Sequence, residues 1–249
     1  MHVSLKSLLK EYIDEVLLEP KRKNPIGISA LVKSGEGVNN IINVYNEATP
    51  EEKDYWGKWY HHAKKDVEEL TEKYREDLKE FVTSETPFEV MAAIVAVLSP
   101  GNNWASNVTA AEKIMSNARL VNAYPKNVYK ANFIKLTGDT SLVTGPKVEV
   151  FFQSLLDPKS VETRMVLDGH AINIWRGEKL PLKGLKNPAK DERIEMINAY
   201  QEASTKLNIP VQAIQAVTWY IWKYSSNDLK PAPEVPNIIP NAQVPEKSS

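Results

Sequence analysis

The chain contains no cysteine among its 249 residues. This absence excludes disulfide bonds, cysteine nucleophiles, zinc–thiolate sites and iron–sulfur clusters built by the chain itself. Long apolar runs are also missing, because no stretch reaches the roughly 18 residues that a membrane helix requires. The N-terminal stretch lacks the layout of a signal peptide, since Glu11, Asp14 and Glu15 interrupt its apolar positions. We therefore expect a soluble protein of the cytoplasm with no membrane partner.

An excess of positive charge is lacking as well, because the formal net charge is −1 at pH 7. Tight, nonspecific binding to nucleic acid normally depends on many contacts between Lys or Arg side chains and phosphate. A DNA-acting protein with this balance must gather its positive charge on one face. The candidates are the run Lys21-Arg22-Lys23 and the spread of Lys179, Lys183, Lys186 and Lys190. Ordinary solvated surface is the competing interpretation of these charges.

Strand patterns are scarce, and helical periodicity runs through most of the chain. Thr49–Glu52 and Thr86–Glu89 each combine an N-cap threonine, a proline in the first turn and a glutamate near the helix start. The apolar stretch at 90–98 follows the second signal, and its alanines and methionine predict a buried helix. We predict an all-α fold with helices at residues 3–18, 39–47, 49–82 (two helices or one bent helix), 87–98, 104–117, 125–135, 146–156, 169–176, 190–207 and 210–224.

The chain divides into three parts by composition. Residues 1–25 form an amphipathic helix, ended by Pro20, and a short linker. Residues 26–229 form the helical domain. The tail at 230–249 carries five prolines and few apolar anchors, so we expect it to be disordered. The N-terminal helix and the tail are candidate docking elements for a protein partner.

Three polar segments interrupt the apolar helices and are candidates to carry chemistry. The first runs from Ser99 to Trp104 after the buried helix, where Trp104 is placed to stack on a base. The second, Gly145-Pro146-Lys147, opens one helix, and the third, Asp168-Gly169-His170, opens another.

Lys147 and Asp168 each allow two interpretations. Lys147 falls in the first turn of its helix, where the positive end of the helix dipole disfavours a cation. Partial burial would further favour the neutral amine, which can form a Schiff base, whereas an ordinary surface lysine is the alternative. Asp168 is either an N-cap or a functional carboxylate. His170 has no cysteine or paired histidine near it, so we expect no metal and no cofactor.

The order of these segments resembles the helix-hairpin-helix DNA glycosylase superfamily, the group of endonuclease III and adenine glycosylase. In that family an apolar helix ends in a Leu-Ser turn, a hairpin ends in Gly-x-Lys, and an Asp-x-His element opens a later helix. Leu98-Ser99, Gly145-Pro146-Lys147 and Asp168-Gly169-His170 fill those places. The chain also resembles a set of bacteriophage proteins that share the Leu-Ser-Pro, Gly-Pro-Lys-Val and Asp-x-His-Ala segments. The resemblance covers about residues 87–224.

This resemblance implies two helical halves flanking a cleft that holds a base flipped out of DNA. It implies cleavage of the N-glycosidic bond, with Asp168 as the catalytic carboxylate and Lys147 as the nucleophile of a lyase step. It also places a phage-encoded chain in the host cytoplasm. The residues implied to bind the base or the DNA are Ser99, Asn102, Asn103, Trp104, Gly145 and His170.

The hairpin departs from the family pattern, and two other functions stay open. The family hairpin is usually Leu-Pro-Gly-Val-Gly, whose glycines let backbone amides approach a phosphate. Here Leu142–Pro146 has one glycine and a proline that lacks an amide. One alternative is a phage transferase that builds a hypermodified base on the same fold and leaves the glycosidic bond intact. The other is a noncatalytic module that binds DNA or protein.

Overall fold

The computed structural model describes residues 36–79, 86–158, 165–178, 180–182, 185 and 188–224. Every regular element in these ranges is helical and none is a strand, so the predicted all-α class is confirmed. No helix in these ranges is long and apolar enough to cross a bilayer. The expectations for residues 1–25, for the tail at 230–249 and for six of the seven basic candidates fall outside the described residues. These six are Lys21, Arg22, Lys23, Lys179, Lys183 and Lys186.

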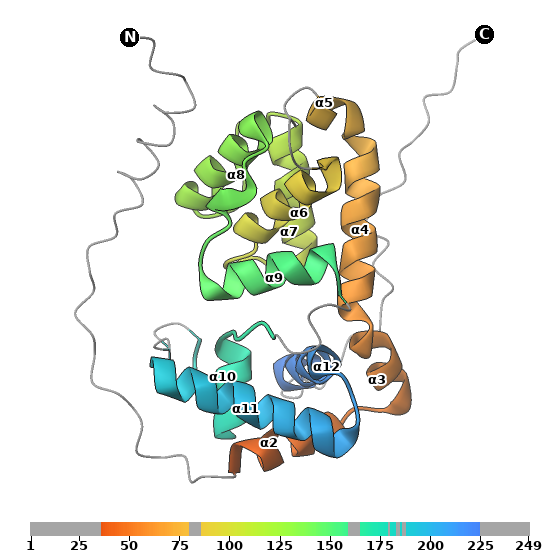
Figure 1. The fold of residues 1–249 in the computed structure, drawn as a ribbon, viewed down its shortest axis with the longest axis vertical. Helices are drawn as coiled ribbons and strands as arrows, with labels where there is room; N and C mark the ends of the chain where they lie inside the picture. Colours follow the sequence, from red (N-terminus) through yellow and green to blue (C-terminus); the bar gives the residue numbers. More distant parts are fainter. Residues whose placement is uncertain are drawn as a thin grey trace.

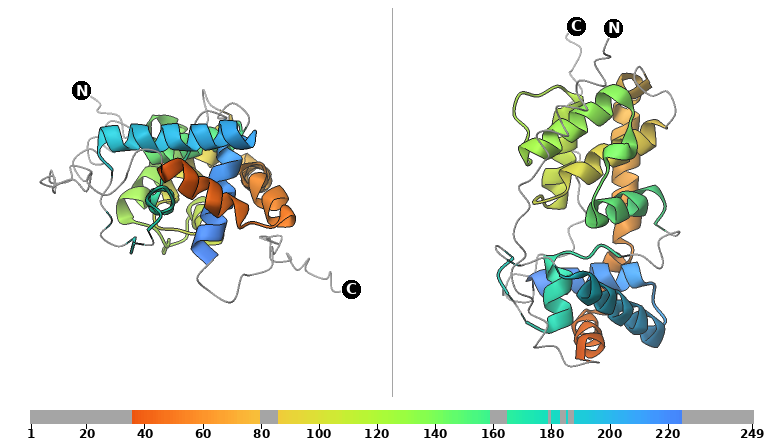
Figure 2. Two further views of the ribbon diagram at one scale, coloured as in Figure 1. Left: turned by 90° about the horizontal axis from the view of Figure 1, so that it is seen from below. Right: turned by 60° about the vertical axis from the view of Figure 1, so that its left-hand side comes forward.

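The helices group into two lobes (Figure 1 and Figure 2). One lobe packs α4 to α9 around a first hydrophobic core, and the other packs α2, α3 and α10 to α12 around a second. The bounds are α2 Glu36–Asn46, α3 Pro50–Gly57, α4 Trp59–Lys73, α5 Arg75–Lys79, α6 Pro87–Leu98, α7 Trp104–Met115, α8 Pro125–Thr137, the 3-10 helix η1 Thr140–Leu142, α9 Pro146–Leu156, α10 Gly169–Arg176, α11 Lys190–Leu207 and α12 Val211–Tyr224.

The lobe built on the second core contains both ends of the described chain. It holds α2 and α3 from the start and α10, α11 and α12 from the end, while the middle of the chain forms the other lobe (Figure 1). The chain therefore crosses between the lobes twice, at the junction of α3 with α4 and between α9 and α10. This path brings side chains from distant parts of the sequence to the interface between the lobes.

Both predicted helix starts are capping boxes. Thr49 Oγ1 accepts a hydrogen bond from the Glu52 amide at 3.2 Å, and Glu52 accepts one from the Thr49 amide at 2.8 Å. Thr86 and Glu89 repeat the pattern at 3.2 and 2.7 Å. Each box satisfies two backbone donors that a helix start leaves without partners, which is why these helices begin where they do.

Helix α6 is the centre of the first core, as its sequence predicts. All residues from Val90 to Leu98 are at most 3% exposed, and the helix contacts α4, α7, α8 and α9. A helix that is apolar on every side requires neighbours all around it, and these four helices supply them.

The segment predicted as one bent helix or two at 49–82 forms three helices in the described part, α3, α4 and α5. The helical backbone is interrupted at Lys58 and again at Tyr74. The first break has a packing reason, because α3 lies on α12 in one lobe while α4 lies on α6 and α9 in the other. One straight helix could not meet both sets of neighbours.

Gly37 provides a stability test in the second core. A Cβ at this position would lie 2.2 Å from both Cδ1 and Nε1 of Trp175, whose side chain is buried. Gly37→Ala is therefore expected to lower the free energy of unfolding by about 1–3 kcal/mol through overpacking, although alanine normally improves a helix. The matched control is Gly57→Ala, whose Cβ would lie 3.7 Å from the Cβ of Ala213. This change should raise the free energy of unfolding by up to about 1 kcal/mol. Urea unfolding measures both, and equal effects of the two changes would contradict the expected clash.

Candidate functional site

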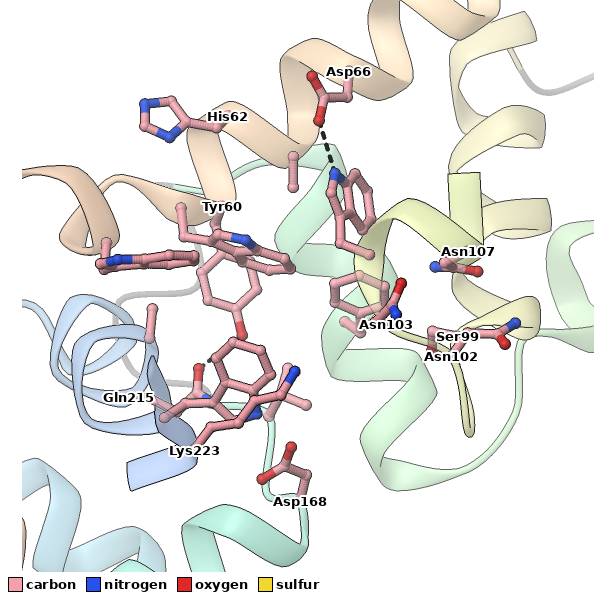
Figure 3. Close-up of a pocket in the computed structure, with 18 of the residues that line it drawn as sticks. Tyr60, His62, Asp66, Ser99, Asn102, Asn103, Asn107, Asp168, Gln215 and Lys223 are labelled. Atoms are coloured by element: carbon pink, nitrogen blue, oxygen red, sulfur yellow. Dashed lines mark hydrogen bonds between the residues drawn. The ribbon is translucent and has the colours of Figure 1, made fainter. Parts of the chain in front are cut away.

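A pocket with a volume of about 400 Å³ lies between the two lobes. Its walls come from α3, α4, α7, α9 and α12, from the turn after α6 and from the segment that leads into α10. This volume falls in the range of about 300–1,000 Å³ that is typical of small-molecule sites. Figure 3 shows Asp66 at one end of the pocket, Asp168 at the other and Tyr60 between them.

The walls of the pocket are rich in aromatic rings. The Trp59 and Trp104 rings meet edge to face with centroids 5.5 Å apart, and Phe151 lies 6.2 Å from Trp59 and 6.3 Å from Trp104. Flat aromatic faces of this kind suit a planar ligand such as a nucleobase. The aromatic residues that line the pocket are Tyr55, Trp56, Trp59, Tyr60, Trp104, Phe151 and Trp219.

Six of the eight site residues predicted from the sequence line this one pocket. They come from three segments that are far apart in the chain, and they meet because the turn after α6, the start of α9 and the start of α10 all face the space between the lobes. Gly145 and His170 are not among the lining residues. The six are Ser99, Asn102, Asn103, Trp104, Lys147 and Asp168.

Asp168 is the N-cap of α10, as one of its two interpretations requires. Its Oδ1 atom accepts hydrogen bonds from the amides of His170 and Ala171, each at 3.0 Å. Both bonds fall on the same oxygen, so the cap leaves Oδ2 available to a ligand in the pocket. Capping and a functional role are therefore compatible at this position.

Lys147 lies in the first turn of α9, as predicted, and its side chain is exposed at the edge of the pocket. This exposure agrees with the alternative interpretation of Lys147 as an ordinary surface lysine. The reason is its place on the helix, since the buried face of α9 is formed by Phe151, Phe152 and Leu155.

The hairpin before α9 does not present its glycine amide to the solvent. Gly145 has φ 102°, a conformation that side-chain-bearing residues rarely adopt, and its amide donates to Glu149 Oε1 at 2.8 Å. On the other side of the turn, Lys130 Nζ donates to the Leu142 carbonyl at 3.2 Å and to Thr144 Oγ1 at 2.8 Å. Side chains thus hold this turn through three hydrogen bonds.

The two asparagines after α6 have structural partners. Asn102 Nδ2 donates to the carbonyls of Leu98 and Asn122, at 3.0 and 3.1 Å. Asn103 is the N-cap of α7, because its Oδ1 accepts from the Ser106 amide at 2.8 Å. Both side chains shape the pocket wall, and the prediction that they bind DNA or substrate stays a prediction.

His170 lies behind the pocket wall rather than in it. Its ring meets Trp219, a lining residue, edge to face with the centroids 6.0 Å apart. The pocket therefore does not support the prediction that His170 contacts a ligand directly. The ring instead packs against α12.

The polar residues of the pocket that sequence reasoning missed include Tyr60, Asp66 and Gln215. Asp66 accepts a hydrogen bond from Trp104 Nε1 at 2.7 Å, and the Tyr60 hydroxyl donates to Gln215 Oε1 at 2.9 Å. Asp66 and Gln215 lie inside regular helices with no turn or motif beside them, and Tyr60 is the second residue of α4, just after the break at Lys58. The only sequence signal was an unusual number of aromatic residues between positions 55 and 60.

Burial raises the pKa of Asp66, and the hydrogen bond from Trp104 offsets part of that rise. The folded chain therefore binds this proton more tightly than the unfolded chain, whose aspartate pKa is about 3.9. The stability that Asp66 contributes is fully present below that pH and is lost as the pH rises through the raised pKa. Asp66→Asn removes this loss. In urea unfolding, the stability of the variant relative to the wild type should therefore increase between pH 4 and 7. A difference that stays constant over this range would contradict the direction of the shift.

No group of three or more histidine, aspartate or glutamate side chains in the described ranges could hold a metal ion. The pocket gathers a carboxylate at a helix start, an exposed amine and flat aromatic faces around one space.

Comparisons with known proteins give one match. No curated protein and no solved structure matches the chain. The model of a family of unknown function, DUF7178, matches residues 26–226, which is most of the chain. The chain therefore belongs to the DUF7178 family.

Proposed function

We propose that this protein is a glycosylase-like enzyme that acts on a base flipped out of DNA. The observation that carries the proposal is the aromatic pocket between the lobes, which gathers Asp168, Lys147 and Trp104 from three separate segments. An enzyme that works on a base has to take it out of the stack and hold it in such a pocket. The packing of Trp59, Trp104 and Phe151 gives the ring of that base flat surfaces to lie against.

Asp168 has the central role in the proposed reaction. The bond between the base nitrogen and C1′ of the sugar breaks, and its electron pair leaves with the base. The carboxylate of Asp168 stabilises the positive charge that develops on the sugar. Water then supplies the oxygen that bonds to C1′, and a proton from the water ends on the released base.

Lys147 would take part in a second, lyase reaction. Its amine, once neutral, attacks C1′ in place of water and forms a Schiff base when the sugar ring opens. Its exposure at the edge of the pocket allows an approaching sugar to reach it. Loss of a proton from C2′ then expels the phosphate from C3′, and this β-elimination cleaves the strand.

The arrangement of the helices supports the helix-hairpin-helix assignment within this proposal. Residues 138–145, which include η1, connect α8 to α9, and Lys147 lies in the first turn of α9. Two helical lobes flank the pocket, as the resemblance implies (Figure 1). The bound amide of Gly145 argues for contacts to DNA other than those of the family hairpin.

The test is a glycosylase assay on oligonucleotides that carry a panel of damaged and modified bases, in single and double strands. We expect release of free base from at least one substrate. Strand cleavage that needs alkali would assign the reaction to Asp168 alone, and cleavage without alkali would implicate Lys147. In that case borohydride should trap a covalent adduct that Lys147→Ala abolishes. Lys206→Ala is the control, since Lys206 is an exposed lysine in the last turn of α11 and outside the pocket lining.

Failure to release a base from any member of the panel would contradict the proposal. A base that gains mass while the glycosidic bond survives would point to the transferase alternative. Binding without any covalent change would point to a noncatalytic module.

A further inference from the structure

Gln215 on α12 presents an amide to the proposed base pocket. Its side chain lines the pocket although the residue is only 6% exposed. A buried amide requires partners for both its oxygen and its nitrogen, because leaving either one unpaired is costly. The arrangement of these partners decides what the amide can recognise.

Tyr60 fixes the direction of this amide. Its hydroxyl donates to Gln215 Oε1 at 2.9 Å in a buried hydrogen bond. Burial raises the pKa of Tyr60 well above its usual value, and the charge of Asp168 raises it further, so the hydroxyl keeps its proton and continues to donate. With Oε1 turned toward Tyr60, the N–H groups of Nε2 are turned away from it. In the described part of the chain, the bond to Tyr60 is the one hydrogen bond of this side chain.

Two other buried donors at the pocket are already in use. The indole N–H of Trp104 is bound to Asp66, and the hydroxyl of Tyr60 is bound to Gln215 itself. The lysines at the pocket are long and flexible, and a carboxylate such as Asp168 accepts rather than donates. Gln215 therefore offers the pocket a neutral donor, and the bond from Tyr60 that fixes its direction is drawn in Figure 3.

We propose that Gln215 reads a carbonyl oxygen on the ring of the bound base, so that the pocket selects bases with a keto group. This inference rests on the proposed function, because it takes the ligand to be a nucleobase. The aromatic walls hold any planar ring, whereas the amide N–H distinguishes an acceptor oxygen from a hydrogen at the same ring position. Selection by one fixed hydrogen bond amounts to about a tenfold difference in affinity.

The test uses pairs of nucleosides that differ by one keto group. Inosine is compared with nebularine, which lacks the 6-oxo group, and uridine with zebularine, which lacks the 4-oxo group. Binding to the full chain is followed by quenching of tryptophan fluorescence, since Trp56, Trp59, Trp104 and Trp219 line the pocket. We expect the keto member of at least one pair to bind about tenfold more tightly. Equal affinity within both pairs, or no binding by any of the four nucleosides, would overturn the inference.

Variants separate the role of Gln215 from general effects on the fold. Gln215→Met keeps the length of the side chain and should abolish the tenfold selectivity. Gln212→Met is the matched control, because Gln212 is equally buried on the same helix but bonds to Ser154 and lies outside the pocket lining. Should Gln215→Met fail to fold, Tyr60→Phe serves instead, since loss of the hydroxyl frees the amide to turn and should lower the selectivity several-fold. Selectivity that survives in either folded pocket variant would overturn the inference.

The outcomes distinguish this inference from the glycosylase proposal. Keto selectivity that depends on Gln215, in a protein that releases no base, would support the inference and contradict the glycosylase reaction. Base release with the same substrate preference in wild type and Gln215→Met would support the glycosylase reaction and contradict the inference about Gln215.

Discussion

Replacing Asp168 with asparagine is expected to slow base release by about 10²–10³-fold on a proven substrate. The carboxylate faces the pocket from the mouth of α10, where its charge would stabilise the positive sugar as the glycosidic bond breaks. Asparagine has nearly the same shape and no charge. The change therefore removes the electrostatic contribution and little else.

The fold should survive this substitution, because asparagine can replace the cap. Its Oδ1 can accept the two amide hydrogen bonds, from His170 and Ala171, that Asp168 accepts now. Asparagine caps helices about as well as aspartate, so the free energy of unfolding should change by roughly 0.5 kcal/mol or less. Thermal unfolding followed by circular dichroism checks this alongside the rate.

Two controls isolate the charge of Asp168 from its cap. Asp168→Ala removes both, and it should lose about 1 kcal/mol of stability in addition to the rate. Asp139→Asn changes an aspartate N-cap at η1, outside the pocket lining, and should leave the rate of base release unaltered. Near-full activity in Asp168→Asn would reduce Asp168 to a cap and contradict the proposed mechanism.

The sequence predicted the elements of this fold well because their signals are local. The capping boxes at Thr49 and Thr86 are complete within four residues, and the apolar run of α6 identifies a buried helix without knowledge of its neighbours. The predicted pocket residues were found for a related reason. Helix starts such as those at Lys147 and Asp168 are visible in the sequence, and three of the segments with such signals meet in space.

Local sequence signals did not predict how the lobes pack. They also did not predict the pocket residues whose positions depend on that packing. Gln215 and Asp66 lie inside regular helices, where a single polar residue is normally interpreted as exposed to solvent. Their hydrogen-bond partners come from the opposing lobe or from a neighbouring helix. The depth of Lys147 also stayed open in the sequence. A position in the first turn says nothing about depth, and the side chain lies at the edge of the pocket instead of inside it.

Lys135 is the clearest case of a residue whose burial the sequence does not predict. It is a lysine of α8, and only 5% of its surface is exposed. Its Nζ atom donates to the carbonyls of Ile114 and Met115, at 3.1 and 2.8 Å, and to Asn117 Oδ1 at 2.8 Å. Burial lowers the pKa of this amine, while the charge of Asp77 acts in the opposite direction.

These contacts close the C-terminal end of α7. Asn117 has φ 55°, and the Ala118 amide reaches back to the Lys113 carbonyl, so the helix ends in a Schellman-type turn. A cation is favoured at this end of a helix because the dipole and the last carbonyls are negative there. Lys135 thus joins α7 to α8 by charge as well as by hydrogen bonds.

Lys135→Met should therefore lower the free energy of unfolding by about 2–4 kcal/mol, since it leaves acceptors buried without their donor. For a folded region of this size the loss amounts to a fall of roughly 5–15 °C in melting temperature. Lys206→Met is the matched control: Lys206 also lies in the last turn of its helix, but it is exposed and paired with the exposed Glu202, so its loss should cost no more than about 0.5 kcal/mol. Thermal unfolding of the two variants decides the matter. A Lys135→Met protein that melts within two or so degrees of the control, roughly the effect of 1 kcal/mol, would show that the end of α7 is held by its own turn and not by Lys135.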